Sequence, residues 1–246
     1  MRTTLAAAAA CSLIATGAII TLTPATADAA SCTRPTIRST TIDPSTVVLG
    51  TSVPKGITVT TKIETNGCRI DRVEAGLYGP NFIDSYGLDR VDTSNGATTY
   101  ETGLRISPGG LPNADAGRWT SYVTAWGPKT AEGPGPSFRV LRAARLTTNA
   151  TPEPVRKGAK LTIKGSLTRA NWESLTYQGY GNRVVDLQRR SAGGSYRTVK
   201  HVTSAANGAL RTTVTATADA CYRFVFAGSA NTAPTTSKGD CVDVRS

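Results

Sequence analysis

Apolar and polar residues alternate along short stretches of this chain, and residues typical of turns separate the stretches. Clear examples are Ile57–Glu64 (ITVTTKIE) and Leu161–Thr168 (LTIKGSLT), where apolar or β-branched residues recur at every second position. Such alternation is typical of strands with one buried face. Asn-Gly pairs, such as those at positions 66–67 and 207–208, mark turns between consecutive stretches of this kind. No segment shows sustained helical periodicity, so the pattern predicts an all-β protein.

The two halves of the chain repeat one plan. A Pro, a Val and a Gly precede each of these strands with the same spacing, at Pro44, Val47 and Gly50 and at Pro152, Val155 and Gly158. Prolines and a glycine before a strand suit an edge strand that kinks between sheets. Later, an acidic turn leads into an aromatic strand in both halves, at 115–119 and 219–222. The first of these resembles the D-x-G-x-Y corner of immunoglobulin-like domains, with Trp119 in the tyrosine position. We therefore expect two tandem immunoglobulin-like β-sandwich domains, residues 30–141 and 142–246. An indole lacks the hydroxyl of the tyrosine corner, so we expect that bond to be missing.

The N-terminus has the features of a secretory signal peptide. Arg2 precedes an Ala-rich apolar run, and an A-x-A cleavage site follows at residues 27–29. The alternative is a membrane anchor, since the run approaches spanning length. The run is only weakly hydrophobic and no basic cluster follows it, which favours cleavage before Ala30. We expect a secreted protein, in the medium or at the cell wall, without a transmembrane segment after cleavage.

Four cysteines remain after the signal peptide: Cys32, Cys68, Cys221 and Cys241. An even number in an exported chain predicts disulfides, and four cysteines allow three pairings. The simplest pairing is local, Cys32–Cys68 and Cys221–Cys241. In the strand after Asp219, Tyr222 and the two following phenylalanines share one parity and should point inward. Cys221 and Cys241 would then lie opposite each other on the outer face of one hairpin.

The positive charge is confined to the second half of the chain. Residues 30–141 hold 11 Lys or Arg and 10 Asp or Glu, a net of 11 − 10 = +1. Residues 142–246 hold 16 Lys or Arg and 6 Asp or Glu, a net of 16 − 6 = +10. A field of this size attracts polyanions and steers their approach. The alternative is a solvated basic face that aids solubility.

Residues 147–246 resemble a module of secreted actinobacterial proteins. The stretches NATPEPVRKGAKLTIKGSLTRANWE, YQGYGNRVVDLQRR, YRTVKHV and CYRFVFAGSANTAPTTSKGDCVDVR carry the resemblance. It implies an exported, non-enzymatic β-sandwich of poorly known role, sometimes labelled calcium-binding. Aromatic residues are usual in that family where Cys221 and Cys241 stand here, which fits a cross-strand pair.

The residues offer little for catalysis or metal binding. The single histidine, His201, lies among strand residues with no nucleophile signature, so we expect a surface histidine and no enzyme activity. Asp84, Asp89 and Asp92 in one polar stretch are the candidates for a Ca²⁺ site, the one cofactor considered. They lack the EF-hand pattern and Arg90 interrupts them, so we favour a polar loop and no metal.

The stretch ANWESLTYQGYGN, residues 170–182, concentrates aromatic and amide side chains in one predicted loop. Trp172, Tyr177 and Tyr180 would stack on a sugar while nearby amides bond its hydroxyls. The alternative is that Trp172 folds back as a lid on the core. In the first half, Tyr122 and Trp126 face outward if Trp119 and its alternate neighbours face inward. The alternatives are packing between the domains or a one-residue bulge that reverses the parity.

Together these features predict a binding module that acts outside the cell. We expect the second domain to bind an anionic cell-envelope polymer or polysaccharide, and no specific nucleic acid. The expected ligand-binding residues are Trp172, Tyr177, Tyr180, Arg183, Lys160 and Lys164, with Lys200 extending the stripe formed by the two lysines. The alternative is a structural module that contacts another exported protein.

Overall fold

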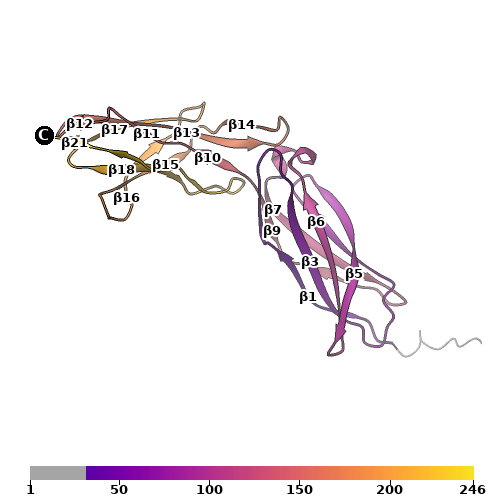
Figure 1. Cartoon of the computed structure of the whole chain (residues 1–246). Coiled ribbons are helices and arrows are strands. Elements are labelled where there is room, and N and C mark those ends of the chain that lie inside the picture. Colours follow the sequence, from indigo (N-terminus) through magenta and orange to yellow (C-terminus); the bar gives the residue numbers. More distant parts are fainter. Residues whose placement is uncertain (1–31) are drawn as a thin grey trace, which may run out of the picture.

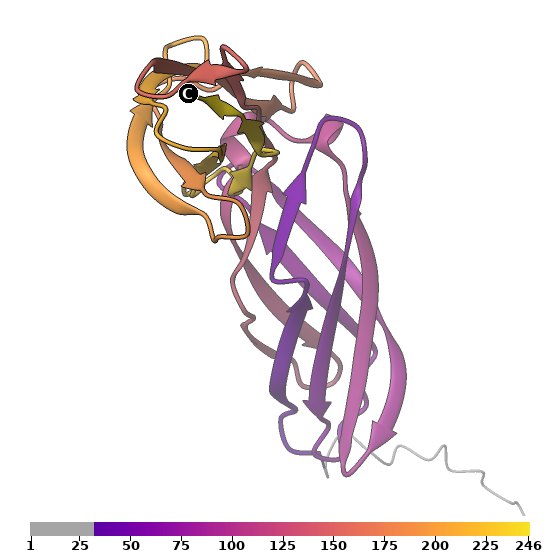
Figure 2. The same ribbon diagram turned by 60° about the vertical axis from the view of Figure 1, so that its left-hand side comes forward.

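The computed structural model describes residues 32–246. The predicted signal peptide and cleavage site lie outside these residues. The described chain forms two elongated lobes of β-strands, joined end to end at an angle (Figures 1 and 2). The described helices are two single 3-10 turns, η1 (Pro108–Gly110) and η2 (Asn113–Asp115). The prediction of an all-β protein is confirmed.

Nine strands form the first lobe. They are β1 (Thr36–Asp43), β2 (Thr46–Leu49), β3 (Lys55–Glu64), β4 (Arg72–Tyr78), β5 (Ile83–Ser94), β6 (Ala97–Ile106), β7 (Gly117–Trp126), β8 (Ala131–Pro134) and β9 (Phe138–Arg142). One layer has the order β1-β3-β6-β5, and the other has β5-β4-β7-β9-β2 with β8 beside β7. The first half of β5 pairs with β4 and the second half with β6, so β5 crosses between the layers.

Twelve strands form the second lobe. They are β10 (Ala144–Leu146), β11 (Asn149–Thr151), β12 (Val155–Arg156), β13 (Lys160–Asn171), β14 (Thr176–Gly179), β15 (Val184–Arg190), β16 (Arg197–Thr203), β17 (Ala209–Thr215), β18 (Ala220–Phe226), β19 (Thr235–Thr236), β20 (Asp240–Val242) and β21 (Val244–Arg245). In one layer, β13 pairs with β10, β11, β14 and β17. In the other, the order is β16-β15-β18, and β18 also pairs with β19 and β20.

In both lobes the chain changes its pairing partner after an early strand, at the Pro of the repeated Pro-Val-Gly spacing. In the first lobe, β1 pairs antiparallel with β3, and β2 crosses to pair in parallel with β9. In the second lobe, β11 pairs antiparallel with β13, and β12 crosses to pair in parallel with β21. A strand that ends in Pro lacks a backbone donor, which suits a change of partner at that point.

Trp119 anchors the core of the first lobe. Its side chain is buried and packs near the rings of Phe82 and Phe138, with centroids 4.9 and 5.6 Å away. Its indole Nε1–H donates to the carbonyl of Asp115, four residues earlier, at 2.8 Å. The hydroxyl bond of a tyrosine corner is absent, as expected, and the indole N–H bonds the upstream backbone in its place.

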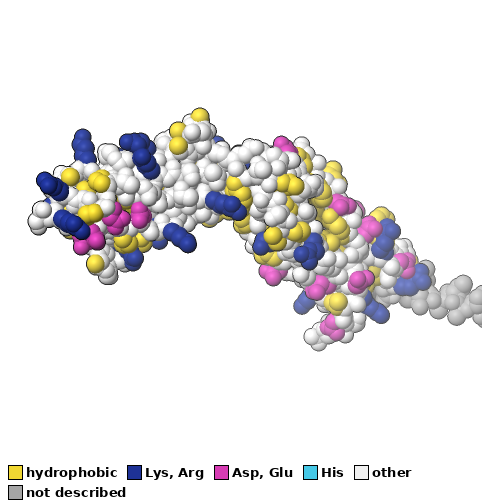
Figure 3. Space-filling model, turned by 45° about the horizontal axis from the view of Figure 1, so that its top comes forward, with side chains coloured by type: hydrophobic (Ala, Val, Ile, Leu, Met, Phe, Trp, Pro, Cys, Tyr) yellow, Lys and Arg dark blue, Asp and Glu magenta, His cyan; other side chains and the backbone are white. Residues whose placement is uncertain are grey.

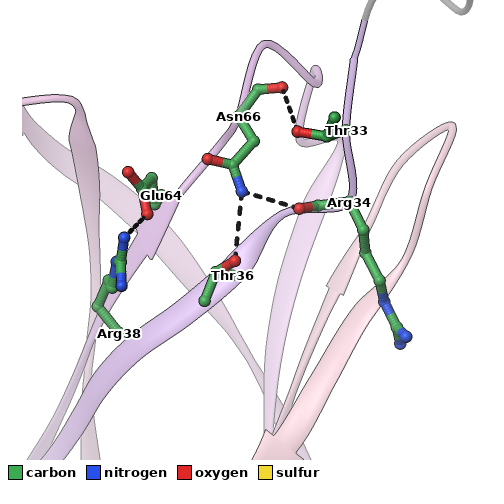
Figure 4. A network of polar contacts seen from close by, with 6 residues as sticks. All are labelled: Thr33, Arg34, Thr36, Arg38, Glu64 and Asn66. Carbon is green, nitrogen blue, oxygen red and sulfur yellow. Dashed lines mark hydrogen bonds and ion pairs between the residues drawn. The ribbon is translucent and has the colours of Figure 1, made fainter.

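The far end of the first lobe is closed by a disulfide and an asparagine. Cys32 is bonded to Cys68, as expected from sequence. Asn66 adopts a positive φ of 51° in its Asn-Gly turn. Its Nδ2 donates to the carbonyl of Arg34 (2.9 Å) and to Oγ1 of Thr36 (3.2 Å), as Figure 4 shows. Arg38 and Glu64 form an ion pair beside it. These contacts fix the start of β1 against the turn after β3.

The second disulfide lies where strand parity predicts. Cys221 and Cys241 face each other directly across β18 and β20 and are bonded. Tyr222, Phe224 and Phe226 on the alternate positions are buried in the second core. The cysteines therefore join two neighbouring strands on the outer face, and the aromatic residues fill the inner one.

Candidate functional site

Trp172 lies in the core of the first lobe, although it belongs to the second. Its side chain is 1% exposed and packs with the apolar cluster that β3, β4 and β7 form. Its indole Nε1–H donates to the carbonyl of Leu49 at 3.3 Å, and its backbone N–H donates to Oδ1 of Asn113 at 2.9 Å. The expected lid exists, but it covers the neighbouring domain. The sequence could not show this, because the alternation of side chains along a strand does not say which of the two hydrophobic cores a residue of the following loop enters.

Polar side chains around Trp172 join the two lobes. Nδ2 of Asn113 donates to Oδ1 of Asn171 at 2.8 Å, and the backbone N–H of Asn113 donates to Oε1 of Glu173 at 2.9 Å. Asn113 belongs to η2 of the first lobe, whereas Asn171 ends β13 of the second. These bonds give hydrogen-bond partners to polar groups that lose their water when the two lobes pack together. The Trp172 loop therefore holds the domains to each other.

Tyr177 is also at the junction. Its ring is half-buried, and the guanidinium of Arg145 lies 3.7 Å from the ring centroid. A β-carbon at Gly50 of the first lobe would lie 3.2 Å from the Tyr177 hydroxyl oxygen, so the two lobes are in close contact there. Tyr177 therefore contributes to the interface more than to an open surface.

Tyr180 is 4% exposed and lies beneath two arginines. The guanidinium carbons of Arg169 and Arg183 are 4.0 and 4.6 Å from its ring centroid. Its ring meets Phe226 edge to face at 5.7 Å, and its hydroxyl is 3.3 Å from Oγ of Ser229. The structure thus does not bring Trp172, Tyr177 and Tyr180 onto one exposed face, because each ring is covered by protein.

The arginines at this junction repel one another. Arg142 is 7% exposed, and its Nε donates to the carbonyl of Ala170. Burial, with a smaller effect from Arg169, lowers the pKa of Arg142 to about 10. Burial also lowers the pKa of Arg169, and Arg183 adds to that effect. This end of the second lobe therefore holds a concentrated positive field.

The positive field of the arginines affects the pKa of the Tyr180 hydroxyl. Burial raises the pKa of Tyr180, but hydrogen bonds with Ser229 and Thr232 and the charges of Arg169 and Arg183 outweigh it. The net result is a pKa below the ordinary value for tyrosine. The phenolate would be stabilised by the two guanidinium groups.

The Lys and Arg residues of the second domain form no salt bridges among the described residues. Four salt bridges occur among residues 32–246, and three of them involve Arg38, Arg69 and Arg72 of the first domain. The fourth joins His201 to Asp186. None of the 16 Lys and Arg residues of positions 142–246 therefore pairs with a carboxylate within the described chain. Figure 3 shows basic side chains at several places on this domain, including its free end.

The predicted lysine stripe is only partly formed. Lys160 and Lys164 lie exposed on β13, and Lys164 stands directly opposite Arg211 of β17. Lys200 lies on β16, in the other layer of the sandwich. The expectation that Lys200 extends the stripe is wrong, because β13 and β16 belong to different sheets.

The aspartates considered for Ca²⁺ are spread along one extended strand. Asp84, Asp89 and Asp92 all lie on β5. At the usual rise per residue, the first and last are roughly 26 Å apart along the strand. Among residues 32–246, no three His, Cys, Asp or Glu side chains gather closely enough to hold a metal ion. The structure therefore does not bring these candidates together.

His201 is exposed on β16. Its Nδ1 is 2.7 Å from Oδ1 of Asp186 on the neighbouring strand β15, and the two residues stand directly opposite each other. The placement agrees with the surface histidine expected from sequence.

The outer face of β4 and β7 carries exposed aromatic rings. Tyr122 and Trp126 point outward, as their parity predicts, and are 36% and 41% exposed. Tyr78 lies beside them, with its hydroxyl oxygen 2.6 Å from where a β-carbon of Gly76 would be. The ring of Tyr78 therefore lies over Gly76, and a larger residue at position 76 would displace it.

Sequence reasoning missed a groove beside the domain junction. It is about 760 Å³ in volume, and its lining includes Arg118, Arg139 and Asn231. Arg118 and Arg139 stand directly opposite each other on β7 and β9. Arg139 also donates to the carbonyls of Ser229 (3.2 Å) and Ala230 (3.1 Å) of the second lobe. The cross-strand pairing of two arginines was not visible without the register.

No protein-family model matches the sequence. No curated protein matches it. Among solved structures, the adhesin InvE of Yersinia pseudotuberculosis is 14% identical over 86% of this chain and 59% of its own, with a TM-score of 0.32. The Escherichia coli adhesin FdeC is 13% identical over 86% of this chain and 66% of its own, with a TM-score of 0.38. An amphioxus IgVJ-C2 molecule is 12% identical over 81% of this chain and 100% of its own, with a TM-score of 0.29. The chain thus spans less than two thirds of either adhesin structure.

The topology defines the class of protein. Two sandwiches of mostly antiparallel strands, each with an early strand that changes partner to form a parallel pair and with an aromatic corner strand, form a tandem of immunoglobulin-like domains. No helix among the described residues is long and apolar enough to cross a membrane.

Proposed function

We propose that this is a secreted, non-enzymatic binding protein whose second domain binds an anionic polymer or polysaccharide of the cell envelope. The observation that supports it most is that none of the 16 Lys and Arg residues of this domain forms a salt bridge among the described residues, and that most of them are exposed. Surface cations that are not paired within the protein remain available to external anions, and their summed field steers a polyanion toward the domain.

Tyrosines position several of these arginines. Besides the stacks on Tyr177 and Tyr180, the guanidiniums of Arg190 and Arg223 lie 5.0 and 3.9 Å from the ring centroid of Tyr196. A stacked guanidinium is attracted by the ring face, and its N–H groups point outward in the plane of the guanidinium, where they can still donate. The tyrosines thereby orient donors, which lowers the entropy lost when an anion binds.

The role of the Trp172 loop differs from the one expected at first. Trp172 and Tyr177 join the domains, so the first domain acts as a spacer fixed to the basic second domain. Arg183, Lys160 and Lys164 remain the proposed contacts for the polymer, because they are exposed and unpaired among the described residues.

The test uses the full chain, because separating the domains would expose Trp172. Retention on purified cell envelope is measured across a salt series for the double variant Lys160→Gln with Lys164→Gln. The matched control is Lys55→Gln with Lys62→Gln, which removes the same charge from β3, the equivalent strand of the first domain. We expect weaker binding for the first pair only, and a steep fall with salt for the parent protein, because exposed charges are screened over about 8 Å at physiological ionic strength.

Equal effects of both pairs, or binding indifferent to salt, would contradict the proposal and leave the charge as an aid to solubility.

The second candidate is a structural module that contacts another exported protein through Tyr78, Tyr122 and Trp126. Their exposure on one sheet face favours it. That function predicts salt-insensitive binding that Trp126→Ser abolishes.

A further inference from the structure

A small basic hollow lies at the free end of the second domain, away from the junction. It is about 360 Å³ in volume, and its lining includes Arg189, Arg190, Ser191, Gly194, Ser195 and Arg197, with Val199 as an apolar neighbour. These residues come from the end of β15, the start of β16 and the hairpin turn between them. No residue that lines this hollow carries a carboxylate.

The hollow is built around two like charges held together by the sheet. Arg189 and Arg197 stand directly opposite each other in the β15–β16 ladder. Like charges at directly opposed positions destabilise a sheet. A register irregularity between Leu187 and Gln188 precedes the pair, and bulges of this kind often re-aim side chains beside binding sites. The fold therefore tolerates a repulsion that a bound anion would remove.

Local contacts hold the arginines in place without neutralising them. Arg189 donates from one terminal nitrogen to Oγ of Ser191 and from the other to the carbonyl of Ala218, both at 3.4 Å. Arg190 lies over the ring of Tyr196. The acidic residue nearest in sequence to Ala218 is Asp219, and its Oδ1 accepts from the backbone N–H of Val244 at 2.7 Å instead. Asp219 thus forms no salt bridge with Arg189, and none of the three arginines is paired with a carboxylate among the described residues.

The geometry points to a binding site for a phosphate group in this hollow, with Arg189 and Arg197 as its main ligands. The inference rests on the proposed function and makes it more specific, since the phosphate would be carried by the anionic polymer. The guanidiniums of Arg189 and Arg197 and the hydroxyls of Ser191 and Ser195 offer more donors than one carboxylate can accept. A phosphate presents several oxygens and binds guanidinium groups bidentately.

A second pair of like charges serves as a control. Lys164 and Arg211 are also directly opposed, on β13 and β17. They lie exposed on a strand face, and neither residue lines this hollow. Arg211→Gln therefore removes the same charge from the same domain without touching the proposed site.

The first experiment titrates the full-length protein with inorganic phosphate, followed by calorimetry and amide chemical shifts. We expect one saturable site whose dissociation constant rises at least about tenfold in Arg197→Gln and in Arg189→Gln. Arg211→Gln should change it less than about twofold, and acetate should not saturate the site. Phosphate should also raise the melting temperature of the parent protein and not that of Arg197→Gln. Equal weakening by all three variants, or equal binding of acetate, would overturn the inference.

The second experiment separates this site from the proposed function. Retention on a poly(glycerol phosphate) matrix is compared with retention on a polygalacturonate matrix of equal charge density. We expect Arg197→Gln to reduce retention on the phosphate polymer and to leave the carboxylate polymer nearly unchanged. If envelope binding depends on Lys160 and Lys164 while phosphate does not saturate, the site is wrong and the proposed function stands. If phosphate saturates the hollow and no envelope polymer binds, the site stands and the proposed function is wrong.

Discussion

The indole of Trp172 donates a hydrogen bond to the carbonyl of Leu49, 123 positions earlier in the chain, across the boundary between two domains. Leu49 ends β2 and Trp172 follows β13, so the bond joins the end of one sandwich to the loop of the other. Both side chains belong to the same buried cluster. The two domains therefore share part of a core, and a rigid junction follows from ordinary apolar burial.

Trp172→Ala should destabilise the first domain although the residue belongs to the second. Truncating a buried large aromatic side chain costs about 3–5 kcal/mol of unfolding free energy, because a cavity remains. Denaturant unfolding followed by circular dichroism measures the loss, and small-angle scattering should show a more variable angle between the domains. The control is Trp126→Ala, an exposed residue whose loss should cost less than about 1 kcal/mol. Similar losses for the two variants would contradict the shared core.

Trp119→Phe tests the corner hydrogen bond. The variant keeps an aromatic ring but leaves the carbonyl of Asp115 without its donor. An unpaired buried acceptor costs about 1–3 kcal/mol, to which lost ring packing adds. Trp126→Phe provides the matched change at an exposed site and should lie within about 0.5 kcal/mol of the parent. Thermal unfolding of both variants decides whether the indole N–H acts in place of the tyrosine hydroxyl.

Removal of the two disulfides should have unequal effects. The loop closed by Cys221 and Cys241 has a sequence separation of 20, and that closed by Cys32 and Cys68 has 36. In the chain-entropy model these contribute about 3 and about 4 kcal/mol, because closing the longer loop restricts the unfolded chain more. Paired Cys→Ala variants, unfolded in denaturant, measure both values. A larger loss at the shorter loop would count against the entropic explanation.

We expect Tyr180 to titrate below, and Tyr86 above, the ordinary pKa of a tyrosine side chain. The pKa of Tyr180 is lowered, whereas burial and a hydrogen bond with Asp84 raise the pKa of Tyr86 to about 12. In the window just below pH 10, the unfolded chain binds more protons than the folded one at Tyr180, so this group makes stability rise with pH. At Tyr86 the folded state keeps its proton longer, so stability falls between about pH 10 and about pH 12.

Ultraviolet absorbance of the phenolate follows both steps. Tyr180→Phe should remove the earliest one, and Arg183→Gln should move it to higher pH, because it removes a positive charge from the ring face. Tyr86→Phe is the control and should leave the earliest step unchanged. An early step that persists in Tyr180→Phe would assign it to another tyrosine.

Local pattern was sufficient for the class of fold. Alternation in Ile57–Glu64 and Leu161–Thr168 predicts strands that the structure has as parts of β3 and β13. The repeated Pro-Val-Gly spacing predicts an early strand that kinks between sheets in both domains, and parity predicts the facing pair Cys221 and Cys241. These features depend on neighbours in sequence, where strand geometry fixes the direction of each side chain.

Tertiary structure alone decided what the aromatic loop and the charges do. Trp172 is buried as the sequence suggested, but the core that receives it is set by the packing of two domains. Likewise, Arg189 faces Arg197 only because a register irregularity aligns β15 with β16 in that way. A sequence gives the number of charges and their position along the chain. Which of them meet, and which lack a counter-charge, depends on distances between strands that are remote in sequence, because electrostatic and apolar contacts act only over a few ångströms of space.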